Sequence, residues 1–363
     1  MRGLVVLALV CAALALGVAL TPGRASAPEP EVVRVVDHLR TRDEPVAGLS
    51  LAFGVDTPPF VFVRSRGQWR CLSVWNAPAD GARIEALLGA LVDAGGVVRA
   101  GASDGGWGLD GEDTLVLELH GRKLLDDPDG DVLLSARFGK PSLLAGVSRA
   151  RSVGSFARLG DDSRVLELAL EPTALVGTST LEGLPPLLAM RVAPPAFPGA
   201  GGPVERVFVE RADGSALELV RSAREPQLVE PGMDPNLALE FAWDLVDAEG
   251  TRAIPPLRGE AFATWTPRAP YDLLADPREF AAFGLERPDV RLTLVPTQGE
   301  ALVLELSAAD ALGRRWVLCR GTPQLARVGP DVARMLTPDA TELSDSSRPN
   351  AWDAWLRAEL SRR

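Results

Sequence analysis

The sequence predicts an α+β protein of two tandem related units, each an antiparallel sheet with one or two packed helices, after an N-terminal hydrophobic helix. Three observations predict this fold. Short apolar segments with period-two alternation recur between turn residues, as is typical of antiparallel strands. A few segments combine helical spacing with capping residues. The order of these signals in the first half of the chain returns in the second half.

The N-terminal segment is apolar without interruption. Residues 4–20 carry no charge over 17 positions, between Arg2 and Arg24. A helix of this length covers roughly 25 Å, against about 30 Å for the hydrocarbon core of a bilayer. The segment is therefore either the apolar region of a secretory signal or a short membrane span.

A cleavage site would lie just after this segment. Residues 25–27, Ala-Ser-Ala, offer the small residues that a signal peptidase recognises, although Pro28 would follow the cut. We predict that residues 1–27 are a signal anchor or a signal peptide, and favour the uncleaved anchor. Residues 28–47 form a predicted tether, in which an apolar stretch at 32–36 is where regular structure would begin. The rest of the chain is then periplasmic, or secreted if the signal is cleaved.

The charge of the chain is strongly negative. Without residues 1–27, which contain two arginines and no acid, 49 acidic and 36 basic side chains remain, for a formal net charge of −13. Such a surface repels phosphate backbones, and the sequence has no basic stripe with interleaved aromatic residues. It therefore predicts no nucleic-acid partner.

The first unit is predicted to span residues 48–190. Alternating apolar residues at 60–63 and 69–72 predict a hairpin that turns at Arg66-Gly67. A hairpin at the start of a unit supplies two neighbouring strands of an antiparallel sheet.

A helix is predicted after this hairpin. Asp80 can cap it, and Gly95-Gly96 would end it. Its apolar face has the spacing i, i+3, i+4 and i+7: Ile84, Leu87, Leu88 and Leu91. Strands at 114–119 and 163–170 complete the first unit.

The second unit is predicted to span residues 204–342. A linker at 191–203 precedes it, in which prolines and glycines interrupt any regular element. Strands at 204–210 and 216–220 flank Asp213-Gly214, a strong hairpin turn.

Two helices are predicted in this unit. Asp234-Pro235 begins the first, with an apolar stripe of Leu239, Ala242, Trp243 and Val246. Asp276 begins the second, with Glu279 placed to complete a capping box and Gly284 to end the helix. The remaining apolar alternations predict the closing strands: 290–294 and 316–328.

The repeated signals carry a resemblance to a known family. An aromatic residue precedes Gly-Leu in both halves, at Trp107-Gly108-Leu109 and Phe283-Gly284-Leu285, and related segments follow at 156–159 and 316–318. Together with the strand-turn-strand-helix order, these residues resemble domain-of-unknown-function family 4340, present twice over residues 48–342. Similar proteins are anchored at the bacterial inner membrane, with the domain outside, and accompany gliding-type ABC transport systems.

The two copies match this family unequally. Residues 284–288, Gly-Leu-Glu-Arg-Pro, follow the family pattern. In the first copy Gly111-Glu112 replaces the proline, and the apolar residues of the next strand are one place out of step.

One serine lies in a hydrolase-like pattern. Residues 101–105, Gly-Ala-Ser-Asp-Gly, match the Gly-x-Ser-x-Gly pattern of a nucleophile elbow, which needs a helix after the serine. Gly106 and then a strand follow instead, and the base would have to be His120 or His38, the only histidines. We therefore interpret Ser103 as part of a glycine-rich connector.

Candidate metal ligands are also weak. Residues 126–131 hold four carboxylates, but Val132 occupies the position where a calcium loop of the EF-hand type requires glycine, and Phe138 stands in place of its final glutamate. An acidic hairpin turn at Asp129-Gly130 is the favoured interpretation. Neither histidine has a second ligand at metal-binding spacing.

Cysteine usage leaves two alternatives. Besides Cys11, which lies in the apolar segment, the chain has only Cys71 and Cys319. Two buried free thiols are the favoured interpretation, and one disulfide between distant parts of the chain is the alternative.

The C-terminal tail, 343–363, contains a short amphipathic segment. Trp352, Trp355, Leu356 and Leu360 share one helical face. Docking on the tail's own domain is favoured over docking on a partner or a membrane.

From these features we predict a non-enzymatic, membrane-tethered extracytoplasmic protein that presents two interaction domains, with an accessory role in an ABC-type transport system implied by the resemblance. Its partners would be the inner membrane, through residues 4–20, and membrane proteins. No catalytic, cofactor-binding or metal-binding residue is predicted. The alternatives are an extracytoplasmic protein that binds a small molecule or glycan and, third, an exported hydrolase.

Overall fold

The computed structural model describes most of the chain from residue 31 onward. The described residues are 31–41, 44–101, 106–121, 132–143, 153–177, 184–185, 187–195, 197, 202–227, 239–322, 324–345, 352 and 354–355. The predicted anchor at 4–20, Ser103 and the acidic segment 126–131 lie outside them. Within the described residues no helix is long and apolar enough to cross a bilayer.

The first half of the chain forms an antiparallel sheet of ten strands within the described residues. The strands are β1 (Val32–Arg34), β2 (Gly48–Phe53), β3 (Phe60–Ser65), β4 (Gln68–Cys71), β5 (Ala77–Pro78), β6 (Gly95–Gly101), β7 (Leu115–His120), β8 (Val132–Leu143), β9 (Val153–Leu159) and β10 (Arg164–Leu168). Their order is β1-β6-β10-β9-β8-β7-β2-β3-β4-β5.

The second half forms an antiparallel sheet in which nine strands are described. The strands are β11 (Val204–Arg211), β12 (Ala216–Gln227), β13 (Leu239–Asp247), β14 (Gly250–Ile254), β15 (Leu273–Ala275), β16 (Val290–Pro296), β17 (Leu302–Leu306), β18 (Arg315–Cys319) and β19 (Gln324–Val328). Their order is β14-β13-β12-β11-β16-β17-β18-β19-β15.

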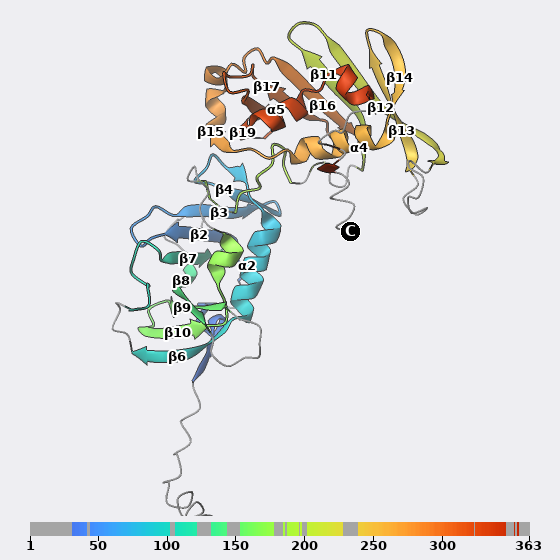
Figure 1. The fold of residues 1–363 in the computed structure, drawn as a ribbon. Coiled ribbons are helices and arrows are strands. Elements are labelled where there is room, and N and C mark those ends of the chain that lie inside the picture. The colour runs from blue at the N-terminus through green and yellow to red at the C-terminus, as the bar shows by residue number, and fades with distance from the viewer. Residues whose placement is uncertain are drawn as a thin grey trace, which may run out of the picture.

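Helices are few and short beside the two sheets. Those described are η1 (Val35–His38), α2 (Gly81–Asp93), α3 (Pro172–Val176), α4 (Pro256–Trp265), η6 (Thr266–Arg268), η7 (Pro277–Phe283), α5 (Pro330–Leu336) and α6 (Ala340–Ser344), where η marks a 3₁₀ helix. In Figure 1, α2 lies along the first sheet, while α4 and α5 lie beside the second. The predicted α+β class with two sheet units is confirmed.

The two units have the same topology. When β2–β10 are matched in order with β11–β19, the two nine-strand orders become identical, and β1 is an additional strand beyond β6. The main helix also falls at the same place, since α2 lies between β5 and β6 and α4 between β14 and β15. Sequential hairpins alone do not produce this order, because β6 and β15 join their sheets beside the last strand of the unit. The same non-sequential strand order thus occurs in both units.

The same three side chains join helix and sheet in both units. In the first, Glu85 of α2 accepts a hydrogen bond from Trp69 Nε1 (2.9 Å) and pairs with Arg64 (3.3 Å). In the second, Glu260 of α4 accepts from Trp243 Nε1 (3.2 Å) and pairs with Arg221 (3.4 Å).

Their positions in the elements match as well. Both glutamates are fifth in their helices, and in each unit the arginine and the tryptophan are direct cross-strand partners. We call these residues the helix–sheet triads.

A second arginine contact is also repeated. Arg83, third in α2, donates to the carbonyl oxygens of Leu175 and Val176 at the end of α3 (3.0 and 2.8 Å). Arg258, third in α4, donates to the carbonyl oxygen of Glu342 in α6 (3.0 Å) and to that of the following Asp345. Since the last carbonyl groups of a helix lack partners within it, each arginine ties the closing helix to the main helix.

The aromatic-Gly-Leu segments occupy equivalent places on the outer face of each sheet, the face opposite the main helix. Trp107 packs against Phe156 of β9 with ring centroids 4.4 Å apart, and Phe283 packs against Trp316 of β18 at 4.2 Å, both with tilted rings. The leucine of each segment is fully buried, and its glycine has positive φ, which explains the Gly-Leu pair.

Most of the predicted elements are confirmed. The hairpins β3–β4 and β11–β12, strands β7, β10, β16, β18 and β19, and helix α2 all lie where the alternation and spacing placed them. Asp80 caps α2 through the amide of Arg83. Gly95-Gly96 follows the helix directly as the start of β6. The short helix after Asp276 is the 3₁₀ helix η7, capped at the amide of Arg278 and ended by Gly284.

The helix predicted through Leu239, Ala242, Trp243 and Val246 is wrong, because these residues form β13. Trp243 and Leu245 point into the core with full burial, while Asp244 and Val246, which alternate with them, are partly exposed. This is the period of a strand rather than of a helix. Strand β12 extends well past the residues that pair with β11. On its other side β12 pairs with β13, from Leu239 to Val246 of β13. The backbone pairing offered by β12 thus outweighs the helical propensity of the segment.

The predicted capping box is also absent at η7. Glu279 has a non-helical backbone there (φ −91°, ψ 16°), and Asp276 alone provides the cap. At the other end of the chain, residues 32–38 of the predicted tether form β1 and η1, and β1 pairs with β6 at the edge of the first sheet.

The proline-rich connection between the sheets packs against both of them. The amide of Ala189 donates to the carbonyl of Pro78 in β5 (3.0 Å), and the amide of Val192 donates to that of Ala269 after η6 (2.9 Å). The side-chain Nε2 of Gln324 in β19 donates a hydrogen bond to the carbonyl oxygen of Arg191 (2.7 Å). One continuous hydrophobic core includes residues of both units and of this connection.

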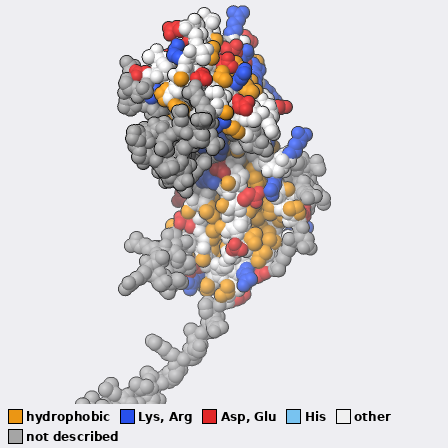
Figure 2. All heavy atoms as spheres, turned by 90° about the vertical axis from the view of Figure 1, so that its right-hand side faces the viewer, with side chains coloured by type: hydrophobic (Ala, Val, Ile, Leu, Met, Phe, Trp, Pro, Cys, Tyr) orange, Lys and Arg blue, Asp and Glu red, His pale blue; other side chains and the backbone are white. Residues whose placement is uncertain are grey.

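The outward side of α2 is sparsely charged. Ala82, Ala86, Gly89 and Val92 are exposed on it. Figure 2 faces this side and shows hydrophobic side chains gathered over the first unit, between scattered charges.

The C-terminal tail docks on its own unit, as predicted. Trp352 is buried and meets Phe262 of α4 edge to face, with ring centroids 5.5 Å apart. Trp355 packs on the same core beneath Arg268. Leu356 and Leu360 lie outside the described residues.

The contact between α4 and Trp243 yields a stability prediction. A Cβ at Gly259 would lie 2.3 Å from Trp243 Cγ, so Gly259→Ala should destabilise the protein by about 1–3 kcal/mol through overpacking. Gly89→Ala in α2 is the matched control, because its Cβ would meet nothing within 4 Å. It should stabilise by roughly 0.5–1 kcal/mol through helix propensity. Denaturant unfolding measures both changes, and equal effects would contradict the close packing of α4.

Candidate functional site

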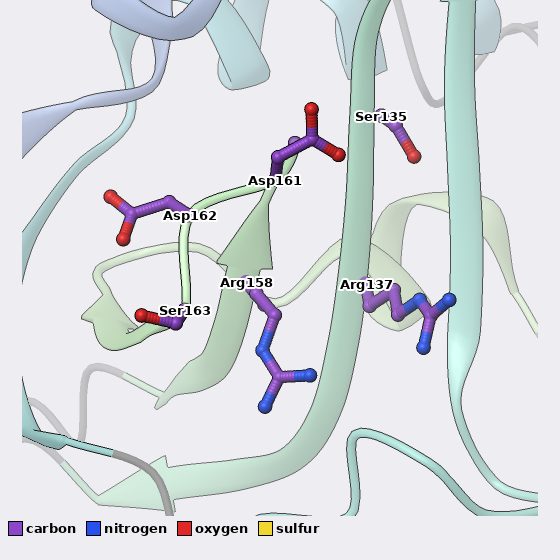
Figure 3. Close-up of a pocket in the computed structure, with 7 residues that line it drawn as sticks. Ser135, Arg137, Arg158, Asp161, Asp162 and Ser163 are labelled. Atoms are coloured by element: carbon purple, nitrogen blue, oxygen red, sulfur yellow. The ribbon is translucent and has the colours of Figure 1, made fainter.

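A hollow among the described residues lies on the outer face of the first sheet. It has a volume of about 570 Å³ and is lined by side chains of β8, β9 and the turn that follows β9. Arg137 of β8 and Arg158 of β9 are direct cross-strand partners within it. Figure 3 shows both guanidinium groups at one end of this hollow, which we call the arginine pocket.

Two like charges opposite each other in a sheet destabilise it unless an acid lies between them. Asp110, directly after the Gly-Leu turn, is that acid. Its Oδ1 lies 3.1 Å from Nη1 of Arg137 and 3.9 Å from Nη1 of Arg158. The Arg137 side chain remains 41% exposed beside this ion pair. The Gly-Leu turn thus positions the carboxylate that holds the two arginines together.

The other end of the arginine pocket is acidic. Gly160, with φ of +54°, turns the chain after β9, and its amide donates to the carbonyl of Ser135 (2.7 Å). The exposed Asp161 follows, with no ion-pair partner among the described residues, and Figure 3 shows its carboxylate turned towards the strand of Ser135. Asp162 beside it is neutralised by Arg164, whose hydrogen bonds lower the pKa of Asp162. The pocket therefore has a basic end and an acidic end.

A second, acidic hollow of about 510 Å³ lies where the loop between β2 and β3 meets the loop before β7. Asp56, Asp110 and Glu112 are among its lining residues. Within the described residues no group of three His, Cys, Asp or Glu side chains is arranged to hold a metal ion.

The histidine considered as a base is buried in the sheet. His120, at the end of β7, is 2% exposed, and its Nε2 lies 2.9 Å from Ser50 Oγ and 3.8 Å from a carboxylate oxygen of Glu118. In a catalytic triad the serine and the acid contact opposite ring nitrogens. Here both polar groups meet the same nitrogen, so the arrangement differs from a triad. Ser103 lies outside the described residues, and His38 is the last residue of η1.

The two cysteines among the described residues are free thiols in separate sheets. Cys71 lies in β4 and Cys319 in β18, and both are buried. Burial raises the pKa of Cys71 to about 12 and that of Cys319 to about 11. Burial, together with the charge of Cys71, also raises the pKa of Tyr271.

The arginine pocket was not predicted from the sequence. Ser135 and Arg137 alternate with buried residues of β8, and Phe156 and Arg158 do so in β9, which marks them as outer-face positions. To predict that Arg137 and Arg158 are neighbours, the pairing of β8 with β9 must be known. The sequence between these strands has no hairpin signal that would indicate this pairing.

These observations define a class: an α+β protein of two copies of one nine-strand unit, with a bipolar polar pocket on the outer face of the first copy. No known family, curated protein or solved structure matches the chain. The resemblance to domain-of-unknown-function family 4340 stays a prediction.

His120 should make stability depend on pH. Burial lowers its pKa below the ordinary value of 6.5, against a smaller opposing effect of Glu118. The unfolded chain therefore binds a proton more readily, and stability that is present above about pH 6.5 is lost as the pH falls. Denaturant midpoints between pH 7.5 and 5 should fall less steeply in His120→Gln than in the unaltered protein. Equal slopes would contradict this, and His38→Gln is the matched control.

The free thiols should be unreactive in the folded protein. Their raised pKa values leave almost no thiolate at pH 8. In a Cys11→Ser variant, an aromatic disulfide reagent should therefore modify neither thiol quickly under native conditions and both in denaturant. Fewer than two thiols in denaturant would instead indicate a disulfide.

Proposed function

We propose that this chain is a non-catalytic extracytoplasmic protein, held at the inner membrane through residues 4–20, which presents its two units to membrane-protein partners. The observation that carries the proposal is the packed connection between two copies of one unit, with hydrogen bonds to both and a shared core. Duplicated units joined in this way offer two related outer faces on one body. An interaction protein gains from this arrangement because contacts at both faces reinforce each other.

Further observations support the same function. The net charge of −13 after residue 27 disfavours nucleic acids as partners. The apolar run at 4–20 favours attachment to a bilayer. The resemblance to family 4340 implies an accessory role beside an ABC-type transport system.

Photo-crosslinking in native membranes tests this function. Amine-reactive reagents suit the chain poorly, since Lys123 and Lys140 are its only lysines. A photoreactive amino acid is therefore placed at exposed Ser163 in the first unit and at Leu312, 66% exposed, in the second. Mass spectrometry should identify the same membrane protein in repeated preparations from at least one position.

A control and two contradicting outcomes complete this experiment. A variant in which a cleavable signal replaces residues 1–27 should lose the adduct, because the body is then released. A reproducibly solitary chain at both positions would refute the interaction function. A mature N-terminus at Ser26 or Pro28 would refute the anchor and leave export intact.

A further inference from the structure

The internal duplication allows the arginine pocket to be compared with the equivalent place in the second unit. Phe156 of β9 and Trp316 of β18 are equivalent, because each packs against the aromatic residue before Gly-Leu. Two residues further along, Arg158 corresponds to Leu318. Their cross-strand partners are Arg137 and Glu305 respectively.

The second unit fills this place with its own side chains. Leu318 forms a buried cluster with Leu285 and Leu325, against which Phe280 and Trp316 pack. Glu305 is 2% exposed and lies between Arg291 (3.0 Å) and Arg320 (2.6 Å). The buried carboxylate of Glu305 is thus paired on both sides, and Leu318 is buried in an apolar cluster.

The first unit differs at the same positions. Where the second unit has Leu318, the first has the charged Arg158, and where Glu305 is enclosed by two arginines, Arg137 is 41% exposed. A hollow of about 570 Å³ remains there. The unit retains the duplicated scaffold but keeps an open polar surface, which points to a ligand rather than to a structural requirement of the fold.

The two ends of the arginine pocket are spaced like side chains of an extended peptide. Ser135 and Arg137 are two residues apart on one face of β8, a distance of about 7 Å. Asp161 lies at the Ser135 end, as Figure 3 shows. Side chains i and i+2 of an extended ligand are also about 7 Å apart and point to one side.

We propose that the arginine pocket binds an extended segment of a partner protein that carries an acidic and a basic side chain two residues apart. The carboxylate lies against Arg137 and Arg158, and the basic group lies against Asp161. The assignment rests on the proposed function and names the chemistry that its partner must present.

Other ligands fit the two ends less well. A lone anion satisfies only the arginine end and is repelled by Asp161. In a free α-amino acid both charged groups are bonded to one carbon, which is too short a span. The negative charge of the chain repels nucleic acids.

Short peptides test the spacing on the full chain in detergent micelles. The probes are acetyl-Glu-Ala-Lys-amide, the i, i+1 isomer acetyl-Glu-Lys-Ala-amide, and the singly charged acetyl-Glu-Ala-Ala-amide and acetyl-Ala-Ala-Lys-amide. NMR titration of arginine Nε–H signals, or calorimetry, measures the dissociation constants. The first peptide should bind roughly tenfold or more tightly than each of the others, because they lack one charge-assisted contact. Inorganic phosphate should bind more weakly as well.

Variants assign the contacts. Arg137→Gln should weaken binding of the first peptide by roughly tenfold and leave acetyl-Ala-Ala-Lys-amide unaffected. Asp161→Asn should weaken the first peptide similarly and leave acetyl-Glu-Ala-Ala-amide unaffected. Arg206→Gln and Glu249→Gln, both exposed in the second unit, are matched controls expected to bind normally. Circular dichroism verifies folding of all four variants.

Three results would overturn the proposal. They are equal affinity for the i, i+2 and i, i+1 peptides, unchanged affinity in both Arg137→Gln and Asp161→Asn, and an affinity for phosphate equal to that for the first peptide. Failure of this proposal is distinguishable from failure of the proposed function. Crosslinked partners without peptide binding would refute the arginine pocket alone, whereas a solitary chain in membranes would refute the interaction function.

Discussion

Each unit depends on one carboxylate that joins its helix to its sheet. Glu85 and Glu260 each reach a tryptophan and an arginine that are direct cross-strand partners. These contacts require both the correct strand register and the correct rotation of the helix. A one-residue slip would move the arginine to the opposite face of the sheet and leave the carboxylate without its ion pair. Once the helix is fixed, its third residue, an arginine, can reach the closing helix.

The two copies keep their inner faces alike and differ on their outer faces. An inner face is constrained by packing, since a change of even one methylene is felt in a close-packed core. The helices still show some freedom, because Ile84 of α2 corresponds to Gly259 of α4, which lets α4 approach Trp243 more closely. The outer face does not pack against the main helix. That freedom allows Leu318 in one unit and Arg158 in the other on the same backbone.

Local signals predicted most of the fold and none of the arginine pocket. Hairpins and α2 were predictable because turn residues, alternation and capping lie close together in the sequence. The helix predicted at β13 failed because Ala242, Trp243 and Val246 fit helical spacing, while Phe241, Trp243 and Leu245 also alternate as in a strand. The strand pattern prevails because β13 pairs with the long neighbouring strand β12, which lies outside the ambiguous segment. Likewise, Arg137 and Arg158 become neighbours through the β8–β9 pairing, which leaves no local signal.

The imperfect first copy of the repeat has a simple structural origin. Leu115, the first buried residue of β7, comes seven residues after Gly108, whereas Val290 of β16 comes six after Gly284. One extra residue in the loop shifts the apolar alternation by one place, and the loop absorbs it, since both strands bury the same face. Asp110 lies in this longer loop and contacts both arginines of the pocket. The loop that carries the extra residue therefore also carries the carboxylate that pairs with the two arginines.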